Sequence, residues 1–138
     1  MIMEIAEIER NIVEEFALFQ DWMEKYEYLI ELGKDMPRAD EAQKNDANLV
    51  KGCQSRVWLS CSYDGQALHF KADSDAIITK GMIALLLRVF DGQRPADILA
   101  ADLGFIEETG LKDNLTPTRA NGLLSMIEKI RNYASSYC

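Results

Sequence analysis

The chain is poor in the residue types that hold metal sites and disulfide frameworks. Its 138 residues include three cysteines and one histidine. The cysteines, Cys53, Cys61 and Cys138, are odd in number and form no CxxC pair, which argues against both a disulfide framework and a zinc site. We therefore do not expect a metal centre or disulfide bonds to hold this fold together.

An excess of positive charge is also missing. The chain has 15 basic and 23 acidic residues, which gives a formal net charge of −8. A surface of this sign repels phosphate backbones and anionic lipid headgroups. We therefore expect no nucleic-acid partner and no membrane partner. The charge leaves open a protein partner that carries a basic patch.

Long hydrophobic runs are absent as well. The longest apolar run, residues 82–87, is far shorter than the ~20 residues that a membrane-spanning helix needs. Residues 1–9 carry three glutamates in place of the basic start and apolar core of a signal peptide. We expect a cytoplasmic protein, in which the thiols are mostly reduced.

The chain does have enough apolar sequence for one core. Apolar residues make up 48% of it, and its length fits a single domain, which we assign to residues 1–138. Apolar residues at helical spacing, together with capping signals, predict five helices. The predicted helices cover residues 5–19, 22–33, 76–90, 95–101 and 117–134. Residues 34–48 are polar and are predicted to form a long loop with at most a short helical turn.

A β-hairpin is predicted between residues 56 and 72. Apolar and polar residues alternate in both 56–63 and 68–72, and Asp64-Gly65 between them is a strong hairpin-turn signal. Because an isolated hairpin is only marginally stable, we expect a third strand near residues 48–51 and helices packed on one face. The predicted fold class is α+β, with a small antiparallel sheet of two or three strands packed against several helices.

Cys53 is the cysteine whose surroundings suggest chemistry. Gly52 before it allows backbone conformations that other residues avoid, so a turn can present the thiol in front of the first strand. Lys51 and Arg56 are the only charges nearby, and cationic neighbours favour the nucleophilic thiolate. The alternative is an inert cysteine that only fills space, and the motif by itself leaves both interpretations open.

The other candidates for thiol chemistry are weaker. Cys61 falls on the inward side of its strand and is interpreted as core, and Cys138, the last residue, as incidental. His69 falls on the outward side of the second strand and is interpreted as exposed and non-catalytic. A cysteine hydrolase needs an imidazole within hydrogen-bond reach of the sulfur, so that class is disfavoured.

Polar residues at two helix starts have structural and functional interpretations. Ser74 or Asp75 is expected to cap the helix that begins near Ala76. Arg119 lies in the first turn of the last helix, where a cation opposes the helix dipole. Helix stability does not explain Arg119, so we expect it to pair with an acid such as Asp73 or Asp75, or to contact a partner.

Four blocks of sequence resemble the SufE family of sulfur-transfer proteins. They follow the family's order from the second helix to the last. Departures are minor, such as Thr118 where the family often has serine. The blocks are Trp22-Lys25-Tyr26 with Leu29-Ile30-Leu32-Gly33, Gly52-Cys53-Gln54-Ser55 with Val57-Trp58, Asp73-Ser74-Asp75-Ala76 with Lys80-Gly81, and Leu115-Thr116-Pro117-Thr118-Arg119 with Gly122-Leu123.

The resemblance implies a fold shared with IscU-type scaffold proteins, and an activity. SufE-like proteins accept sulfur from a SufS-like cysteine desulfurase, raise its turnover, and pass the sulfur on for iron–sulfur cluster assembly on a SufBCD-type scaffold. The cysteine of the second block carries the sulfur, and that residue is Cys53 here. The resemblance thus implies a sulfur-transfer protein rather than a stand-alone enzyme.

Further expectations follow from this resemblance. The chain should need no cofactor of its own, because pyridoxal phosphate belongs to the desulfurase, and it should be a monomer or a weak homodimer. A persulfide needs protection from water and oxidants, so Cys53 should rest against apolar side chains in the free protein. The residues expected to support Cys53 or to contact the partner are Lys51, Gly52, Gln54, Ser55, Arg56, Asp75 and Arg119.

Two other functions remain open at this point. An iron–sulfur scaffold would bind the cluster itself, which usually takes about four ligands, mostly thiolates. A regulator would bind a desulfurase and change its rate without carrying sulfur. A cysteine peroxidase ranks last, because the chain lacks a clear helix-borne thiol motif.

Overall fold

The computed structural model describes residues 3–137, in which the chain forms six α-helices, three 3-10 helices and two strands. This confirms the α+β class expected from the sequence. The α-helices are α1 (Ile5–Ala17), α2 (Trp22–Asp35), α3 (Ile77–Phe90), α4 (Pro95–Ala100), α5 (Phe105–Glu108) and α6 (Pro117–Ser136). The strands are β1 (Val57–Tyr63) and β2 (Leu68–Ser74), and the 3-10 helices are η1 (Glu41–Gln43), η2 (Asp46–Asn48) and η3 (Lys112–Asn114).

The sheet is the predicted antiparallel hairpin of β1 and β2, which pair from Val57 opposite Ser74 to Tyr63 opposite Leu68. The Asp64 side chain accepts the backbone N–H groups of the two residues that close the turn, and Gly65 has a φ of +98°. The alternation of side chains and the turn signal therefore predicted this element correctly.

The third strand expected near residues 48–51 does not form among the described residues. Only one bridge connects this segment to β1, between Leu49 and Trp58, and the Val50 N–H donates to the Val57 carbonyl at 2.7 Å. The chain turns away directly afterwards at Gly52, whose φ is +97°. A turn at this position prevents the pairing from continuing, so the sheet keeps two strands.

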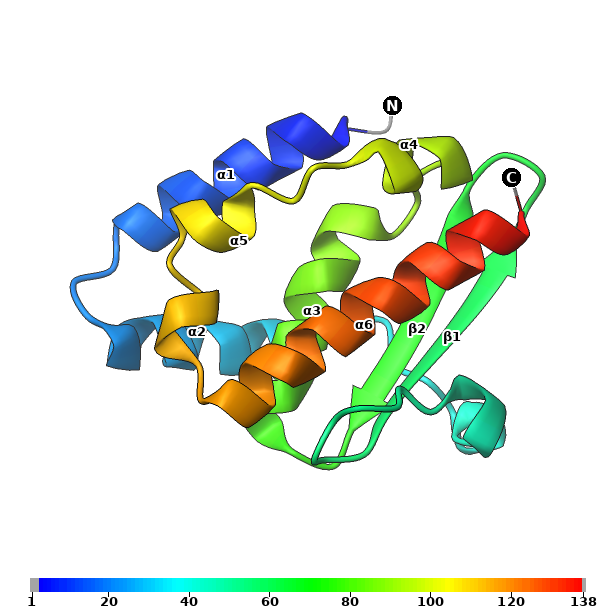
Figure 1. The fold of residues 1–138 in the computed structure, drawn as a ribbon, viewed down its shortest axis with the longest axis horizontal. Helices are drawn as coiled ribbons and strands as arrows, with labels where there is room; N and C mark the ends of the chain where they lie inside the picture. Colours follow the sequence, from blue (N-terminus) through cyan, green and yellow to red (C-terminus); the bar gives the residue numbers. More distant parts are fainter. Residues whose placement is uncertain (1–2, 138) are drawn as a thin grey trace.

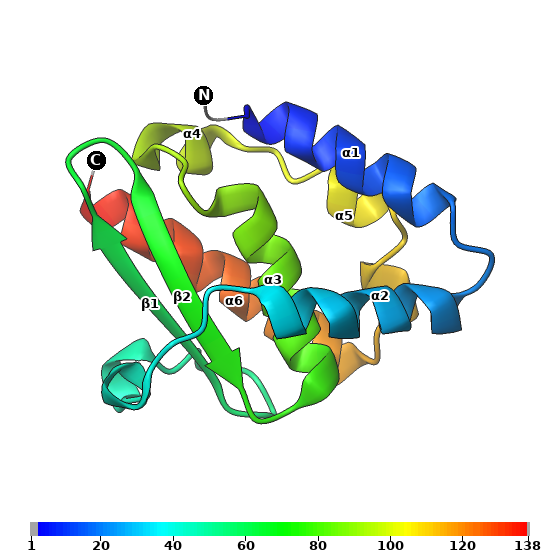
Figure 2. The same ribbon diagram turned by 180° about the vertical axis from the view of Figure 1, so that it is seen from behind.

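The polar segment 36–48 begins at the free edge of β2 and then crosses the hairpin to the β1 side, where η1 and η2 lie (Figure 2). The Ala72 N–H donates to the Pro37 carbonyl, and the Ala39 N–H donates to the Ala72 carbonyl, both at 3.0 Å. The segment then forms η1 and η2, so the predicted loop with a short helical turn is confirmed. Because these bonds occupy the outward backbone groups of Ala72, residues 37–39 cover part of an otherwise open sheet edge.

Helix α3 is the centre of the molecule, with α2, α6 and the hairpin around it (Figures 1 and 2). A Cβ atom on Gly81 would lie 2.3 Å from the Leu29 carbonyl oxygen, so α2 and α3 cross where no larger residue fits. Gly33 was predicted to end the second helix, which is wrong. Gly33 lies inside α2 and packs against Gly81, and α2 ends before Pro37.

Helices α1 and α6 pack on either side of this centre, as Figure 1 shows. Ile12 and Phe16 of α1 are buried, and so are Leu123, Met126 and Ile130 of α6. The five predicted helices lie within two residues of the observed bounds, whereas α5 and η3 lie between residues 101 and 117, where the sequence predicted no helix. Among the described residues, no helix combines the length and the apolar character that crossing a membrane requires.

Candidate functional site

Cys53 lies on a short loop, residues 51–55, that is anchored at both ends. Before the loop, the Val50 N–H donates to the Val57 carbonyl. After it, the Arg56 N–H donates to Oδ1 of Asp75 at 3.0 Å, and the Asp75 N–H donates to the Arg56 carbonyl at 3.2 Å. The loop is therefore fixed where it leaves the sheet and where it returns.

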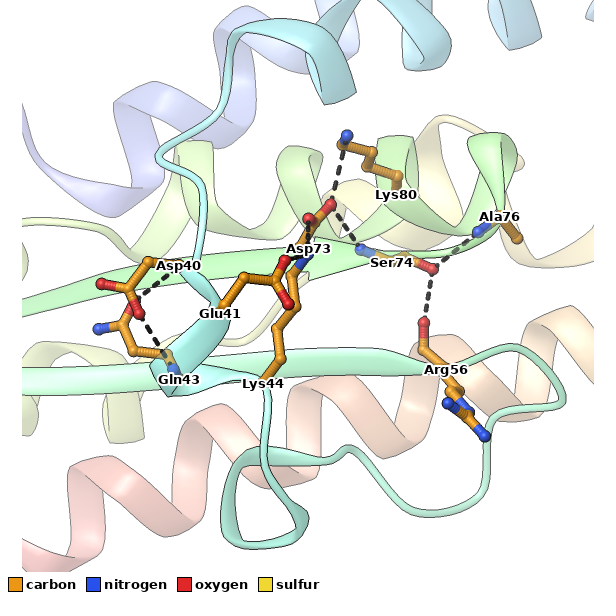
Figure 3. A network of polar contacts seen from close by, with 9 residues as sticks. All are labelled: Asp40, Glu41, Gln43, Lys44, Arg56, Asp73, Ser74, Ala76 and Lys80. Carbon is orange, nitrogen blue, oxygen red and sulfur yellow. Dashed lines mark hydrogen bonds and ion pairs between the residues drawn. The ribbon is translucent and has the colours of Figure 1, made fainter.

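Ser74 adds a second contact at the returning end. Its hydroxyl donates to the Arg56 carbonyl at 2.8 Å and accepts the N–H of Ala76 at 3.2 Å (Figure 3). The expectation that Ser74 or Asp75 caps the next helix is wrong, because Ala76 occupies the N-cap position of α3 and no side chain caps it. The oxygens of Ser74 and Asp75 are instead engaged in holding Arg56.

The loop packs against one face of α6, which is formed by small residues. The Cys53 thiol lies 3.6 Å from the Gly122 carbonyl oxygen as a hydrogen-bond donor, and a Cβ on Gly122 would lie 3.3 Å from the sulfur. One turn further along α6, Ser125 lies against Gly52. A Cβ added to Gly52 would lie 2.4 Å from the Ser125 hydroxyl oxygen. Helix α6 therefore leaves room for this loop only because both partners are small.

A cavity of about 90 Å³ opens beside the sulfur. Its wall includes Met82, Met126 and the buried Thr79. Gln54 and Arg119, which the sequence proposed as site residues, also line it. A cavity needs only ~10–15 Å³ to admit one water, so this space also admits one additional sulfur atom on Cys53.

Burial raises the pKa of the Cys53 thiol, which is half-buried. The sequence had suggested the opposite direction, because Lys51 and Arg56 were expected to favour the thiolate. Both cations are exposed, where water and salt weaken their effect on a sulfur that packs against α6. This resting arrangement therefore favours the neutral thiol over the thiolate.

The structure separates the other thiol and the histidine from Cys53. Cys61 lies opposite Phe70 in the hairpin and is half-buried, less than the core position expected, and burial raises its pKa to about 11. His69 is exposed, as expected, and contacts Asp64 at 2.7 Å. His69 pairs with Ser62, the sixth residue of β1. Ser62 lies about 17 Å along β1 from Val57, the end of the strand nearest Cys53 in the chain. Cys138 lies outside the described residues.

A buried carboxylate connects the polar segment to the elements around the site. Asp73 is 6% exposed and contacts the ammonium groups of Lys44 at 2.9 Å and Lys80 at 3.2 Å (Figure 3). Burial alone would raise the pKa of Asp73, but the hydrogen bonds from both lysines and from the Ser74 N–H hold it below its ordinary value. Asp73 thus joins η1 to α3, and its ion pairs do not involve Arg119.

The structure thus brings together most of the residues that the sequence proposed. Gln54, Ser55 and Arg119 line the cavity beside Cys53, and Asp75 anchors the loop. The sequence reasoning missed the contacts of Ser125, Thr79 and the two methionines, and it gave Gly122 no role of its own. The spacing of Gly122 and Ser125, three residues apart on one helix face, was the only signal for this packing surface. No three His, Cys, Asp or Glu side chains of residues 3–137 are grouped as a metal site.

The fold and the site together define a small α+β protein that holds one half-buried cysteine on a loop anchored at both ends. The chain belongs to the SufE family, because the family model described as an Fe-S metabolism associated domain matches residues 10–134. The resemblance found in the four sequence blocks is therefore confirmed.

Relatives support the same assignment. An uncharacterized SufE-like protein of Rhizobium meliloti (strain 1021) is 40% identical over 129 residues, which cover 90% of this chain and 92% of the relative. A second uncharacterized SufE-like protein, from Rhizobium etli, is 38% identical over 129 residues, which cover 90% of this chain and 87% of the relative. The solution structure of a hypothetical protein from Thermus thermophilus superposes with a TM-score of 0.77 at 19% identity, and it covers 94% of both chains. At this identity the last comparison supports the fold alone.

Proposed function

We propose that this protein accepts sulfur from a cysteine desulfurase onto Cys53 and passes it on for iron–sulfur cluster assembly. One observation carries the proposal: Cys53 is held on an anchored loop, with its sulfur against α6 and beside a cavity large enough for one more sulfur atom. Membership of a family associated with Fe–S metabolism supports the same role.

The acceptance step is an exchange between a thiolate and a persulfide. The Cys53 thiolate attacks the outer sulfur of a persulfide on the desulfurase cysteine, and the bond between the two donor sulfurs breaks. The donor cysteine leaves as a thiolate, and Cys53 becomes the persulfide. Such exchange depends on the thiolate fraction, on nucleophilicity and on access, and it consumes no oxidant or reductant.

Both access and the thiolate fraction are limited in the resting arrangement. The sulfur is half-buried, and burial raises its pKa. The loop must therefore leave α6 before Cys53 reacts. Cys53 is three residues from Val50 and three from Arg56, so an extended loop carries it on the order of 10 Å from either anchor. The anchors thus confine the movement to residues 51–55.

The cavity beside Cys53 supplies a place for the persulfide between transfers. Met82, Met126 and Thr79 form part of its wall, together with polar side chains such as Gln54 and Arg119, so the outer sulfur would be partly shielded from bulk water. We infer that the loop returns to α6 after acceptance and shields the persulfide until an acceptor binds.

The remaining assignments are part of the same proposal. The donor is a SufS-like enzyme whose pyridoxal phosphate releases sulfur from cysteine, and the acceptor is a SufBCD-type scaffold. This chain needs no cofactor for the exchange, because thiolate and persulfide supply all the reacting atoms. We propose that it works in the cytoplasm as one domain, as a monomer or a weak homodimer.

Intact-mass spectrometry after incubation with a SufS-like desulfurase and cysteine tests the proposal. The wild-type chain and Cys61→Ser should gain the mass of one sulfur atom, and Cys53→Ser should gain none. If this chain raises the turnover rate of the desulfurase but gains no sulfur itself, it is instead a regulator. Cluster absorbance on the isolated protein after anaerobic reconstitution would establish a scaffold.

A further inference from the structure

The wall of the cavity beside Cys53 contains a polar group without a partner. Thr79 of α3 is only 8% exposed, and its hydroxyl forms no hydrogen bond within residues 3–137. The other buried threonine, Thr109, donates from its hydroxyl to the Ile106 carbonyl at 3.2 Å. Threonines in helices often bond to a carbonyl of the preceding turn in this way, and buried polar groups are as a rule paired. The unused hydroxyl of Thr79 therefore points to a ligand.

The Thr79 hydroxyl faces the cavity. Two side-chain polar atoms of residues 3–137 are fully enclosed without a partner, and the Thr79 hydroxyl is not one of them. The hydroxyl therefore keeps contact with open space, and the space that Thr79 lines is the cavity beside Cys53. Ala76 and Met82, one turn away in either direction on the same face of α3, line the same cavity. Thr79 is thus the polar group in the middle of this face.

The position of Thr79 at the start of α3 favours a negatively charged ligand. Thr79 is the third residue of this 14-residue helix, and the N-cap residue Ala76 offers no side chain to its first N–H groups. The positive end of the helix dipole therefore lies at the cavity wall. Among the described residues of this wall, Arg119 is the one that carries a charge, and it is positive. The nearby carboxylate of Asp75 accepts the Arg56 N–H through Oδ1.

We propose that Thr79 binds the outer sulfur of the Cys53 persulfide, to which its hydroxyl donates a hydrogen bond while the loop lies against α6. This inference rests on the proposed function. The outer sulfur of a persulfide accepts hydrogen bonds, and once ionised it carries a negative charge that the hydroxyl and the start of α3 both stabilise. The unloaded thiol makes a different contact, because it donates to the Gly122 carbonyl. Thr79 therefore gains its partner only when Cys53 carries sulfur.

The location of Thr79 on α3 gives this bond a consequence for the loop. Gln54 also lines the cavity, but it belongs to the loop and moves with Cys53, whereas Thr79 belongs to the buried central helix. The outer sulfur therefore loses Thr79 each time the loop leaves α6. The bond stabilises the docked loop in the sulfur-loaded protein alone, so it retains the persulfide until an acceptor binds.

Two substitutions of Thr79 separate its hydroxyl from its shape. Thr79→Val removes the hydroxyl and nearly keeps the shape, and Thr79→Ser keeps the hydroxyl. Thr118→Val is the matched control, because Thr118 lines the same cavity but is exposed, so water serves its hydroxyl. Since the Thr79 hydroxyl has no partner within residues 3–137, Thr79→Val should leave the urea midpoint of the unloaded protein unchanged.

Loss of the outer sulfur to cyanide measures the bond. Each protein is loaded in two ways, with a desulfurase and cysteine, and with inorganic polysulfide. Cyanide then attacks the outer sulfur and leaves with it as thiocyanate, while Cys53 returns to the thiolate. The sulfur remaining on the Cys53 peptide is followed by mass spectrometry. Alkylation of unloaded Cys53 by iodoacetamide measures how firmly the loop is docked without sulfur.

Thr79→Val should lose its outer sulfur at least about tenfold faster than the wild type, which is the change expected when a hydrogen bond to a charged group is removed. Thr79→Ser should stay within about threefold of the wild type, because its hydroxyl restores the bond. Thr118→Val should behave as the wild type. Unloaded Cys53 should be alkylated at the same rate in all four proteins.

Equal rates of sulfur loss from Thr79→Val and the wild type would overturn the inference. A Thr79→Val protein whose unloaded Cys53 is alkylated faster by the same factor would overturn it too, because Thr79 would then only pack against the loop. A wild-type chain that gains no sulfur from the desulfurase, while the polysulfide-loaded proteins follow the expected order, would overturn the proposed function and support the sulfur site at Thr79.

Discussion

Gly52→Ala is expected to release the Cys53 loop from α6. An alanine at a φ of +97° costs about 1–3 kcal/mol, because a side chain strains this conformation. Its Cβ would also lie 2.4 Å from the Ser125 hydroxyl oxygen and 3.3 Å from the Ser125 Cβ. Rotation of the hydroxyl relieves the first contact only. The docked state should therefore lose at least about 1–2 kcal/mol, which is a 5- to 30-fold change in its population.

Alkylation of Cys53 by iodoacetamide, followed by peptide mapping, measures this release. The Cys53 peptide of Gly52→Ala should react about 5–30 times faster than that of the wild type at pH 8. Burial raises the pKa of Cys53 in the docked loop, so release should also move the pH profile of alkylation to lower pH. Adding Ser125→Ala should partly restore slow alkylation.

Gly65→Ala is the matched control. Its φ is +98°, but a Cβ there meets nothing within 4 Å, so it shares the backbone cost without the contact with α6. It should lower the free energy of unfolding by about 1–3 kcal/mol and leave the alkylation rate unchanged. The reasoning is wrong if Gly52→Ala is destabilised to the same degree while its Cys53 reacts no faster than in the wild type.

Three further substitutions test the surroundings of the site in urea unfolding. Cys61→Ser should cost about 1–3 kcal/mol, near the lower end because Cys61 is half-buried, and should keep sulfur acceptance; loss of acceptance at unchanged stability would contradict its structural role. Asp73→Asn should cost about 1.5–3 kcal/mol at pH 7 by removing the bonds to Lys44 and Lys80. Because the folded pKa of Asp73 is lowered, this difference should be complete above about pH 4 and disappear as the pH falls further; a pH-independent difference would contradict the ion pairs. Thr116→Ala should cost about 0.5–2 kcal/mol, because the Thr116 hydroxyl accepts the Arg119 N–H at the start of α6, and an unchanged midpoint would contradict this cap.

The local elements were predictable from the sequence because their signals are local. The alternation of apolar and polar residues and the Asp64-Gly65 turn define the hairpin. The capping side chains of Asp21 and Thr116 define where α2 and α6 begin. The role of Gly33 was not predictable in this way. A glycine near a helix end suits both termination and close packing, and only the position of Gly81 in space decides between them.

The site was predictable in its residues but not in its electrostatics. Gly52 and Cys53 mark a turn with a thiol, and the resemblance to SufE proteins gave that thiol a role. The direction of the pKa shift came out wrong, because burial depends on Gly122, which lies 69 residues away along the chain. The pairing of Asp73 with Lys44 likewise joins segments that carry no common local pattern.

A stoichiometric exchange with a preloaded donor tests the central claim most directly. A SufS-like desulfurase is charged with labelled sulfur, freed of cysteine and mixed with an equal amount of this protein, and both chains are mapped by mass spectrometry. The account predicts that the donor loses its label as Cys53 gains it as a persulfide, one atom for one. Label that stays on the donor, or that arrives on Cys61, would contradict the account.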